Sequence, residues 1–446
     1  MPGHKPRRKE GAKYLTLNFS IASEDARAFC DHVVARIANE ATRPTTRAKL
    51  VNVVAATTPS LLRAFSEGLW TYRATVKAQF SGERIGFRMF EQWREAMKGL
   101  HLIEHEPGGV RMIEDPWEEG GPAIVTEGIA SHFRPTQGLV DLATSFGITA
   151  ANLESHFKVE MPRTLVFLRD SSKTVKGKKT KGQRRPPPDT PEAKRCEYEV
   201  RAINDYLANI DIGGQLFHGF YRLFNQADTA SFNWNKGGRL YTVDPASYQN
   251  RPKAERLAMT LDGQPVCEID VSASYLTIYH GLIARDYRHL IPAEMRHIIF
   301  DATEDPYSLP GFERAVVKAW VSISLGRGEL VERWSKQISK SFLEEHGKPI
   351  GEIHKAKDVR DAVLGRHPLL GLLNSLPISW ADLMFHESEA IMRAMRELRE
   401  RDIPSLPMHD CLIVPQGDED IATAILKQSY LDICNIVPMI KREALR

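Results

Sequence analysis

The order of apolar and polar positions divides the chain into a mainly helical first part and a mixed second part. Apolar residues at three- and four-residue steps predict amphipathic helices over 45–67 and 85–98. The stretch 99–105 then predicts a short strand, Pro107-Gly108-Gly109 a turn, and 110–113 the returning strand. Helix, helix and β-hairpin is the chain order of a winged helix, whose second helix enters the DNA major groove.

A basic face on the second of these helices is the candidate DNA contact. It is made of Arg84, Arg88, Arg94 and Lys98. The pattern is equally that of a small helical domain with an ordinary solvated basic face, so both interpretations stay open.

The second part contains two acidic residues beside predicted strands. A helix is predicted over 197–224, and Cys267–Asp270 is an apolar-rich strand that ends on a carboxylate. Residues 403–415 hold two short apolar runs around His409-Asp410, which predicts a hairpin with an acid at its tip. By spacing alone, an aspartate at a strand end is usually a turn or cap residue.

Charge and proline content mark a boundary between these parts. Residues 171–188 carry seven lysines and arginines and no acid, and they end in three prolines. Such a segment buries too little apolar surface to fold alone, so it is a solvated linker, a mobile arm for phosphates, or both. We therefore expect five segments: a basic disordered tail (1–20), a helical or winged-helix-like domain (21–125), a helical connection with a partial thumb (126–170), a basic proline-rich linker (171–194), and a mixed domain (195–446).

Composition excludes several classes of protein. The 446 residues are 42% hydrophobic and 26% charged, with a net charge of +3, which is ordinary for a globular chain. No apolar run is long enough to span a membrane, and the basic N-terminus lacks the apolar stretch of a secretory signal. Five scattered cysteines without CxxC pairs argue against structural zinc and predict a cytoplasmic location.

Three segments of the second part resemble the motifs of family-A DNA polymerases, in that family's order. They are Gly238-Arg239-Leu240 with Asp244-Pro245 and Gln249-Asn250-Arg251-Pro252, then Glu268-Ile269-Asp270-Val271-Ser272, then Met408-His409-Asp410. The resemblance covers about residues 195–440, and the His-Asp pair is shared with single-subunit bacteriophage RNA polymerases. It implies an α+β right-hand fold with palm and fingers.

The resemblance also implies roles for individual residues. Asp270 and Asp410 would bind two Mg²⁺ ions, with Mn²⁺ as the alternative metal, and the Val271 carbonyl would complete one coordination sphere. His409 would lie near the primer terminus. The residues implied to contact primer–template DNA are Arg239, Gln249 and Arg256. Without the resemblance, Arg239 is a surface turn residue and His409 packs in its hairpin.

The incoming dNTP would be bound by a helix over 312–325. Arg314 and Lys318 share one face of it, as in the triphosphate-binding helix of the family, although two solvated basic residues give the same spacing. The chain departs from the family after the lysine, where Ser322 and Gly326 replace an aromatic residue and a tyrosine. Trp320 could substitute, but it lies on the wrong helical face. The resemblance therefore does not extend to a base-stacking wall on this helix.

Tyr275, five residues past Asp270, stands where these folds place a residue beside the incoming sugar. A phenol ring there should exclude a 2′-hydroxyl and select deoxynucleotides, unless Tyr275 simply packs in the core. No acidic exonuclease motif precedes residue 195.

We therefore expect a compact, non-proofreading DNA polymerase of a plasmid, phage or mobile element, with replication-origin DNA as a further partner of its first domain. The alternatives are a primase or RNA polymerase of the same fold, and a non-catalytic replication initiator that only binds DNA.

Overall fold

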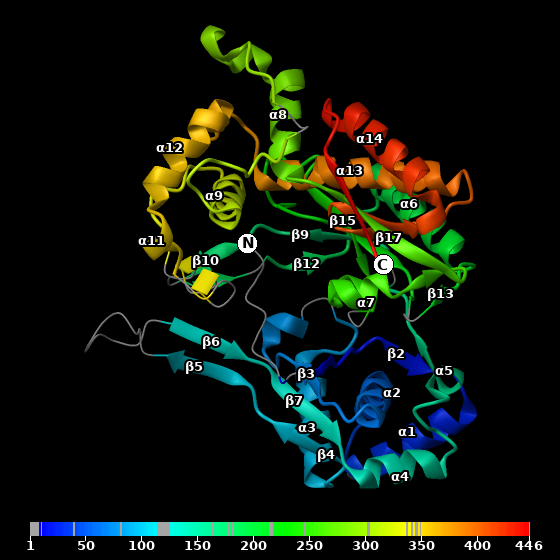
Figure 1. Ribbon diagram of the computed structural model, residues 1–446. Helices are drawn as coiled ribbons and strands as arrows, with labels where there is room; N and C mark the ends of the chain where they lie inside the picture. The colour runs from blue at the N-terminus through cyan, green and yellow to red at the C-terminus, as the bar shows by residue number, and fades with distance from the viewer. Residues whose placement is uncertain are drawn as a thin grey trace.

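The computed structural model in Figure 1 is an α+β protein, as the sequence predicts. It describes residues 9, 11–38, 41–80, 83–113, 125–162, 164–175, 178–180, 182–213, 217–244, 247–300, 304–335, 338–339, 342–343, 347 and 349–445. None of the described helices combines the length and apolar character that crossing a bilayer requires.

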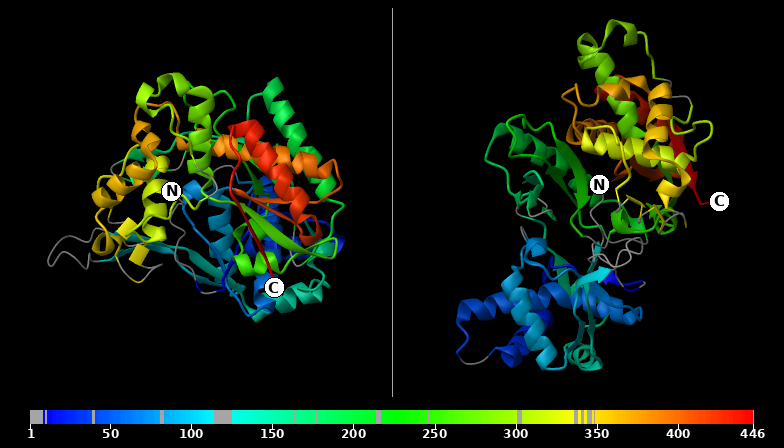
Figure 2. Two further views of the ribbon diagram at one scale, coloured as in Figure 1. Left: turned by 45° about the horizontal axis from the view of Figure 1, so that its top comes forward. Right: turned by 90° about the vertical axis from the view of Figure 1, so that its left-hand side faces the viewer.

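Two large clusters of buried apolar side chains organise the molecule. One extends from Leu15 to Phe157 and the other from Leu165 to Cys434. The two further views in Figure 2 show the corresponding lobes, coloured blue to cyan and green to red. The expected helical connection 126–170 is therefore wrong as a separate segment, because its helices pack into the first cluster and its last strand joins the second lobe.

The first lobe combines helices with small sheets. Its helices are α1 (Glu24–Ile37), α2 (Pro44–Ser66), α3 (Phe87–Gly99), α4 (Gln137–Ser145), α5 (Leu153–His156) and the 3₁₀ helix η1 (Lys77–Phe80). Its strands are β1 (Lys13–Tyr14), β2 (Phe19–Ile21), β3 (Thr71–Arg73), β4 (Ile103–Glu106), β5 (Gly109–Ile113), β6 (Val125–Ile129), β7 (Ser131–Pro135) and β8 (Phe157–Val159). The sheets have the orders β1-β3-β7-β4, β2-β8 and β5-β6. Helices α2 and α3 confirm both predicted helices.

The predicted hairpin between β4 and β5 is wrong. Strand β4 pairs with β7 and β5 pairs with β6, so the chain continues through residues 107–109 instead of turning back. Gly108 is needed because its backbone lies very close to the backbone of the facing strand, and not because the chain turns there. A Cβ atom there would lie 2.4 Å from the Ile129 carbonyl oxygen on the facing strand.

The expected disordered tail is also shorter than predicted. Strand β1 pairs in parallel with β3, and β2 pairs with β8, while Leu15 and Leu17 are buried between them. Residues 1–8 and 10, where the rest of that expected tail falls, lie outside the described residues.

The second lobe contains the longer sheet and most of the helices. Its strands are β9 (Val166–Arg169), β10 (Lys173–Val175), β11 (Lys178–Thr180), β12 (Arg184–Arg185), β13 (Ile212–Gly213), β14 (Phe220–Phe224), β15 (Gly237–Thr242), β16 (Thr260–Leu261), β17 (Gln264–Val271), β18 (Leu406–Met408), β19 (Cys411–Pro415) and β20 (Ile440–Ala444). Its α-helices are α6 (Pro191–Leu207), α7 (Lys253–Leu257), α8 (Ser274–Asp286), α9 (Arg314–Arg327), α11 (Ile350–Ile353), α12 (Ala356–Arg366), α13 (Trp380–Arg399) and α14 (Glu419–Cys434). The 3₁₀ helices are η2 (Tyr248–Asn250), η3 (Arg288–Leu290), η4 (Ala293–Met295), η5 (Pro368–Leu372) and η6 (Gln416–Asp418).

Strand β17 is the centre of this lobe. It pairs antiparallel with β19 on one edge and with β20 and β16 on the other, and β18 and β19 form the predicted hairpin. Helix α13 contacts α8, α14 and β15, the last strand of the second sheet, β12-β9-β14-β15. At its N-terminus the Asp382 carboxylate accepts hydrogen bonds from the Ser379 amide at 2.9 Å and from the Ser379 hydroxyl at 2.6 Å, which helps to fix where this helix begins.

Two sequence-based expectations fail in this lobe. The helix expected over 197–224 ends at Leu207, because Gly213 pairs in a strand and Gly219 has a φ of +101°, which a helix does not allow. The expected linker 171–194 is partly a strand. In β12, Arg185 pairs with Leu168, and the Arg184 guanidinium lies 4.2 Å from the Phe167 ring centre.

Candidate active site

Two carboxylates far apart in the sequence meet at one end of β17. Asp270 is in register with Cys411, the residue that follows Asp410, and the Val271 amide donates a hydrogen bond of 3.2 Å to the Asp410 carbonyl. Antiparallel pairing therefore brings the two aspartates to one edge of a rigid sheet. Regular strands are good supports for side chains that must act together.

The electrostatic state of this pair is unusual. Burial raises the pKa of Asp270 to about 6, and the nearby charge of Asp410 adds to the effect. Burial also raises the pKa of Asp410 to about 7, with a further contribution from Glu387, while Arg239 and Lys318 counteract it. Each carboxylate therefore lacks enough positive charge nearby, which is the condition that a bound divalent cation relieves.

The donor set fits a hard metal ion. Carboxylate oxygens are the ligands that Mg²⁺ prefers, and Mg²⁺ keeps several waters, so two carboxylates suffice to hold it with a phosphate. Within the described part of the chain, no cluster of three or more His, Cys, Asp and Glu side chains suits a metal. The Asp270–Asp410 pair is the candidate site because its two carboxylates come from paired strands.

His409 occupies the turn beside Asp410. Its backbone has a φ of +57°, and its side chain is exposed. A left-handed conformation is uncommon for a residue other than glycine and is often found at functional sites. His409 and Arg239 line one small hollow of about 10 Å³ between β15, α13 and the hairpin.

Arg239 projects from β15 towards a carboxylate that the sequence analysis missed. Its Nε donates a 2.8 Å hydrogen bond to Glu387 of α13, and its Nη2 lies 3.3 Å from the Tyr275 hydroxyl. Burial lowers the pKa of Arg239, but Glu387 and Tyr275 outweigh burial and raise it. Glu387 could have been found as an acid on the apolar face of its helix, four residues after Leu383 and three before Ala390.

The glycine before Arg239 has a structural reason. Gly238 has a φ of +85°, and its carbonyl accepts a 2.7 Å hydrogen bond from the buried Arg222 of β14. A Cβ atom on Gly238 would lie 3.2 Å from that guanidinium. The motif glycine therefore lets β15 lie against a buried charge.

Gln249 and Arg256 are half-buried, and both are hydrogen-bonded within the protein. The Gln249 amide accepts from the Thr242 amide at 3.0 Å and donates to the carbonyls of Leu240 and Pro407. Arg256 donates a 2.7 Å hydrogen bond to Glu268. Both side chains therefore hold the strands around the aspartates, and the structure gives no support to their direct contact with DNA.

Helix α9 carries Arg314 and Lys318, the two cations predicted to bind the nucleotide. Lys318 is exposed, and its charge acts on Asp410. Arg314 pairs with Asp305 and lies 5.4 Å from the ring centre of the buried Tyr307. Trp320 is fully buried and donates to the Val331 carbonyl, so it faces the core and provides no stacking surface.

Comparison with known proteins gives only slight similarity, and only to solved structures. No protein-family model matches the chain, and no curated protein does. A solved structure, the POL domain of Pol1 from M. smegmatis in complex with DNA primer–template and dNTP, matches 56% of this chain and 50% of its own at 15% identity and a TM-score of 0.27. The chain thus spans half the length of that structure. A match at this level assigns nothing, and the function is argued from the site itself.

Only part of the basic face predicted on α3 is free of partners within the described residues and so able to contact DNA. Arg94 pairs with Glu91 and Glu95, and Arg84, before the helix, donates to the Phe19 carbonyl at 3.0 Å. Arg88 is exposed, and among the described residues it has no ion-pair partner. Of these arginines, Arg88 is the one best placed to meet an external phosphate.

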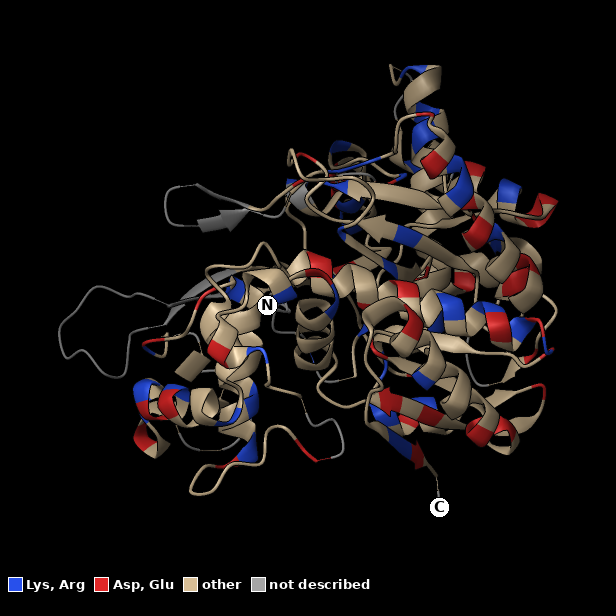
Figure 3. Ribbon diagram, turned by 90° about the horizontal axis from the view of Figure 1, so that it is seen from above, with Lys and Arg blue, Asp and Glu red and all other residues tan. Residues whose placement is uncertain are grey.

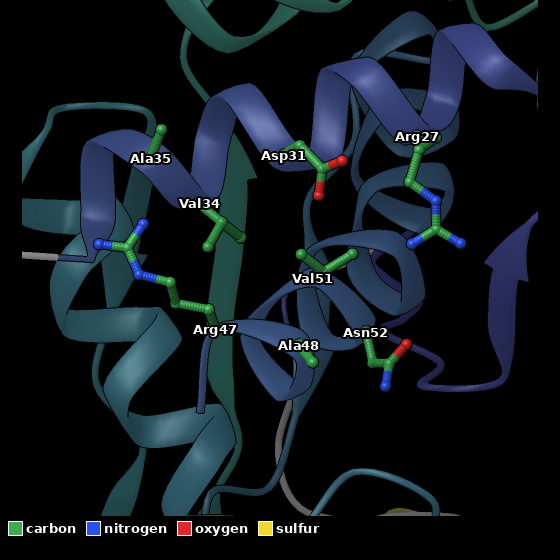
Figure 4. Close-up of a pocket in the computed structure, with 8 residues that line it drawn as sticks. All are labelled: Arg27, Asp31, Val34, Ala35, Arg47, Ala48, Val51 and Asn52. Atoms are coloured by element: carbon green, nitrogen blue, oxygen red, sulfur yellow. The ribbon is translucent and has the colours of Figure 1, made fainter. Parts of the chain in front are cut away.

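A larger hollow lies away from the aspartates. It measures about 400 Å³ between α1 and α2 in the first lobe, and Figure 4 shows its lining. Its walls combine Arg27, Asp31 and Arg47 with small aliphatic side chains from both helices. With one carboxylate and no paired acids, it offers no comparable metal chemistry.

Proposed function

We propose that this protein is a template-directed DNA polymerase with a right-hand palm and fingers of the family-A type. The observation that carries the proposal is the pairing of β17 with β19, which brings Asp270 and Asp410 to the same end of the sheet, where the charge of one acts on the other. Two divalent ions bound there would stabilise charge on the attacking and leaving oxygens of phosphoryl transfer. By analogy, because a candidate DNA-binding domain precedes the palm, we place the protein in the replication of a plasmid, phage or mobile element.

The surrounding residues support this proposal by their positions. Lys318 of α9 carries its charge towards Asp410, where a triphosphate would lie. Arg239 and His409 share a hollow next to the same aspartate, as residues near a primer terminus should. Tyr275 is the second residue of α8 and follows closely after the end of β17. At this position its ring can border the sugar of the incoming nucleotide.

Primer extension with Mg²⁺ and a primed DNA template tests the assignment. We expect wild-type protein to extend the primer with dNTPs, and Asp270→Ala or Asp410→Ala to abolish extension while duplex binding survives. Loss of a metal ligand removes transition-state stabilisation rather than ground-state affinity. Asp361→Ala, which changes an exposed aspartate on α12, is the matched control and should extend normally. Extension by either active-site variant would refute the assignment.

Tyr275 decides between a DNA polymerase and a primase or RNA polymerase of the same fold. If its ring excludes the 2′-hydroxyl, wild type should use dNTPs, and Tyr275→Ala should accept NTPs with a gain of at least about tenfold in relative kcat/KM, as for loss of shape exclusion in a pocket. Parallel extension assays with dNTPs and NTPs measure this. Preference of the wild type for NTPs would favour the alternative.

For the first lobe we propose a winged-helix DNA-binding function. The supporting observation is its order: α2, β3, α3 and then the ribbon β4–β7, with β7 between β3 and β4 in the sheet. A winged helix places its recognition helix before such a ribbon. Replication-origin DNA is the proposed partner.

A further inference from the structure

The two oxygens of the Glu387 carboxylate bind on either side of Tyr275. Oε1 accepts from the Arg239 Nε at 2.8 Å, and Arg239 in turn lies within 3.3 Å of the Tyr275 hydroxyl. Oε2 accepts a 2.8 Å hydrogen bond from the hydroxyl of Ser274, the residue before Tyr275. One buried side chain of α13 thus connects the tip of the tyrosine ring with the backbone that carries it.

The burial of this group needs an explanation. Glu387 is 1% exposed, and a buried carboxylate costs free energy unless it is paired and hydrogen-bonded. Glu387 is both, through Arg239 and Ser274, and Ser274 also contacts the Tyr430 hydroxyl of α14 at 3.1 Å. The side chains of Glu387, Arg239 and Ser274 fix the Tyr275 ring more firmly than apolar packing does, because hydrogen bonds are directional.

We propose that Glu387 is a positioning residue that fixes the Tyr275 ring and thereby sets the discrimination between deoxynucleotides and ribonucleotides. This inference rests on the proposed polymerase function. Steric exclusion of one hydroxyl group depends on placing the excluding atoms to within about half an ångström. Glu387 provides this precision by holding Arg239, whose guanidinium lies 5.7 Å from the ring centre and bonds the hydroxyl.

The variant Glu387→Gln tests the inference, with Glu389→Gln as its matched control. Both changes remove one negative charge from the same helix. Glu389 instead pairs with Arg222 on the neighbouring strand β14, and Arg222 keeps a second carboxylate partner in Glu199. The measured quantity is the ratio of kcat/KM for a dNTP to that for the matching NTP. This ratio does not depend on the fraction of protein that is folded.

We expect Glu387→Gln to lower this ratio by roughly tenfold, the smaller end of what pocket shape confers, and Glu389→Gln to leave it unchanged. If Glu387→Gln does not fold, Tyr275→Phe makes the same test, since it keeps the ring and removes the hydroxyl that Arg239 holds. An unchanged ratio in Glu387→Gln, or in Tyr275→Phe, would overturn the inference. Wild-type protein that extends no primer would refute the polymerase proposal instead, so the two failures are distinct.

Discussion

At the residue level, negative charge is concentrated around the end of β17. Asp270, Asp410 and Glu387 interact there, and Arg239 is hydrogen-bonded to one of the three. Since burial weakens the hydration of each carboxylate, the protein holds this charge at a cost in stability. Active sites often accept such a cost when a charged ligand later offsets it.

This cost gives a dependence of stability on pH. The folded-state pKa values, about 6 for Asp270 and about 7 for Asp410, lie above the unfolded value of roughly 3.9. The folded protein therefore keeps protons that the unfolded chain has lost, and metal-free stability falls as pH rises from about 4 to about 7. The loss is complete about one pH unit above the pKa of Asp410, near pH 8. We expect Asp410→Asn to raise Tm at pH 8 without metal by on the order of 2 °C.

Thermal unfolding of both proteins at pH 4.5 and pH 8 measures this difference. The gain should shrink at pH 4.5, where the wild-type carboxyl is protonated. Added Mg²⁺ should stabilise the wild type more than the variant, because a ligand that binds only the folded state shifts Tm. A variant less stable than the wild type at pH 8 would contradict the argument.

Short sequence motifs locate some of these residues and miss others for a physical reason. Asp270, Asp410 and Tyr275 stand within contiguous motifs, so the sequence alone could single them out. Glu387 acts through Arg239, which lies in a different element far away in the chain, and no local pattern encodes that pairing. Residue type alone also cannot tell that Gln249 bonds backbone groups of two separate strands within the fold.

At the level of elements, Gln249 joins two strands that no ladder connects. It bonds Thr242 and Leu240 of β15 on one side and Pro407 of β18 on the other. We expect Gln249→Ala to lower the free energy of unfolding by about 1–3 kcal/mol, because buried backbone groups lose their partner, and to leave duplex affinity unchanged. Denaturant unfolding and a DNA-binding titration measure these two effects.

The exposed Gln264, at the start of β17, supplies the control: Gln264→Ala should change neither quantity. A Gln249→Ala variant of normal stability but weaker duplex binding would restore the DNA contact that the motif implies.

Glycines explain where element boundaries were predicted wrongly. The sequence pattern Pro107-Gly108-Gly109 resembles a turn, yet Gly108 serves the close approach of the β4–β5 segment to the facing strand. The need for glycine at this position depends on Ile129, about 20 residues further along the chain. A turn pattern read from neighbouring residues does not contain that information. Periodic helices such as α2, and the strands around Asp410, follow from local patterns and were predicted well.

At the scale of the whole molecule, charges of both signs are interspersed along the helices (Figure 3). The chain has 60 lysines and arginines against 57 acids, so no strong overall field attracts nucleic acid. The duplex affinity proposed above must then come from a few cations that lack an internal partner. Whether a surface arginine has an ion-pair partner is therefore a better guide to DNA binding than the net charge.

Helix α3 offers a matched pair of arginines for testing this view. We expect Arg88→Ala to weaken duplex binding and to reduce the slope of log K against log salt concentration by about 0.9, the value for one phosphate contact. Arg94→Ala should leave the slope unchanged, because Glu91 and Glu95 already neutralise that side chain. Titrations of the 446-residue chain with duplex DNA at several salt concentrations give both slopes. Equal slopes for Arg88→Ala and the wild type would mean that α3 does not meet the DNA backbone through Arg88.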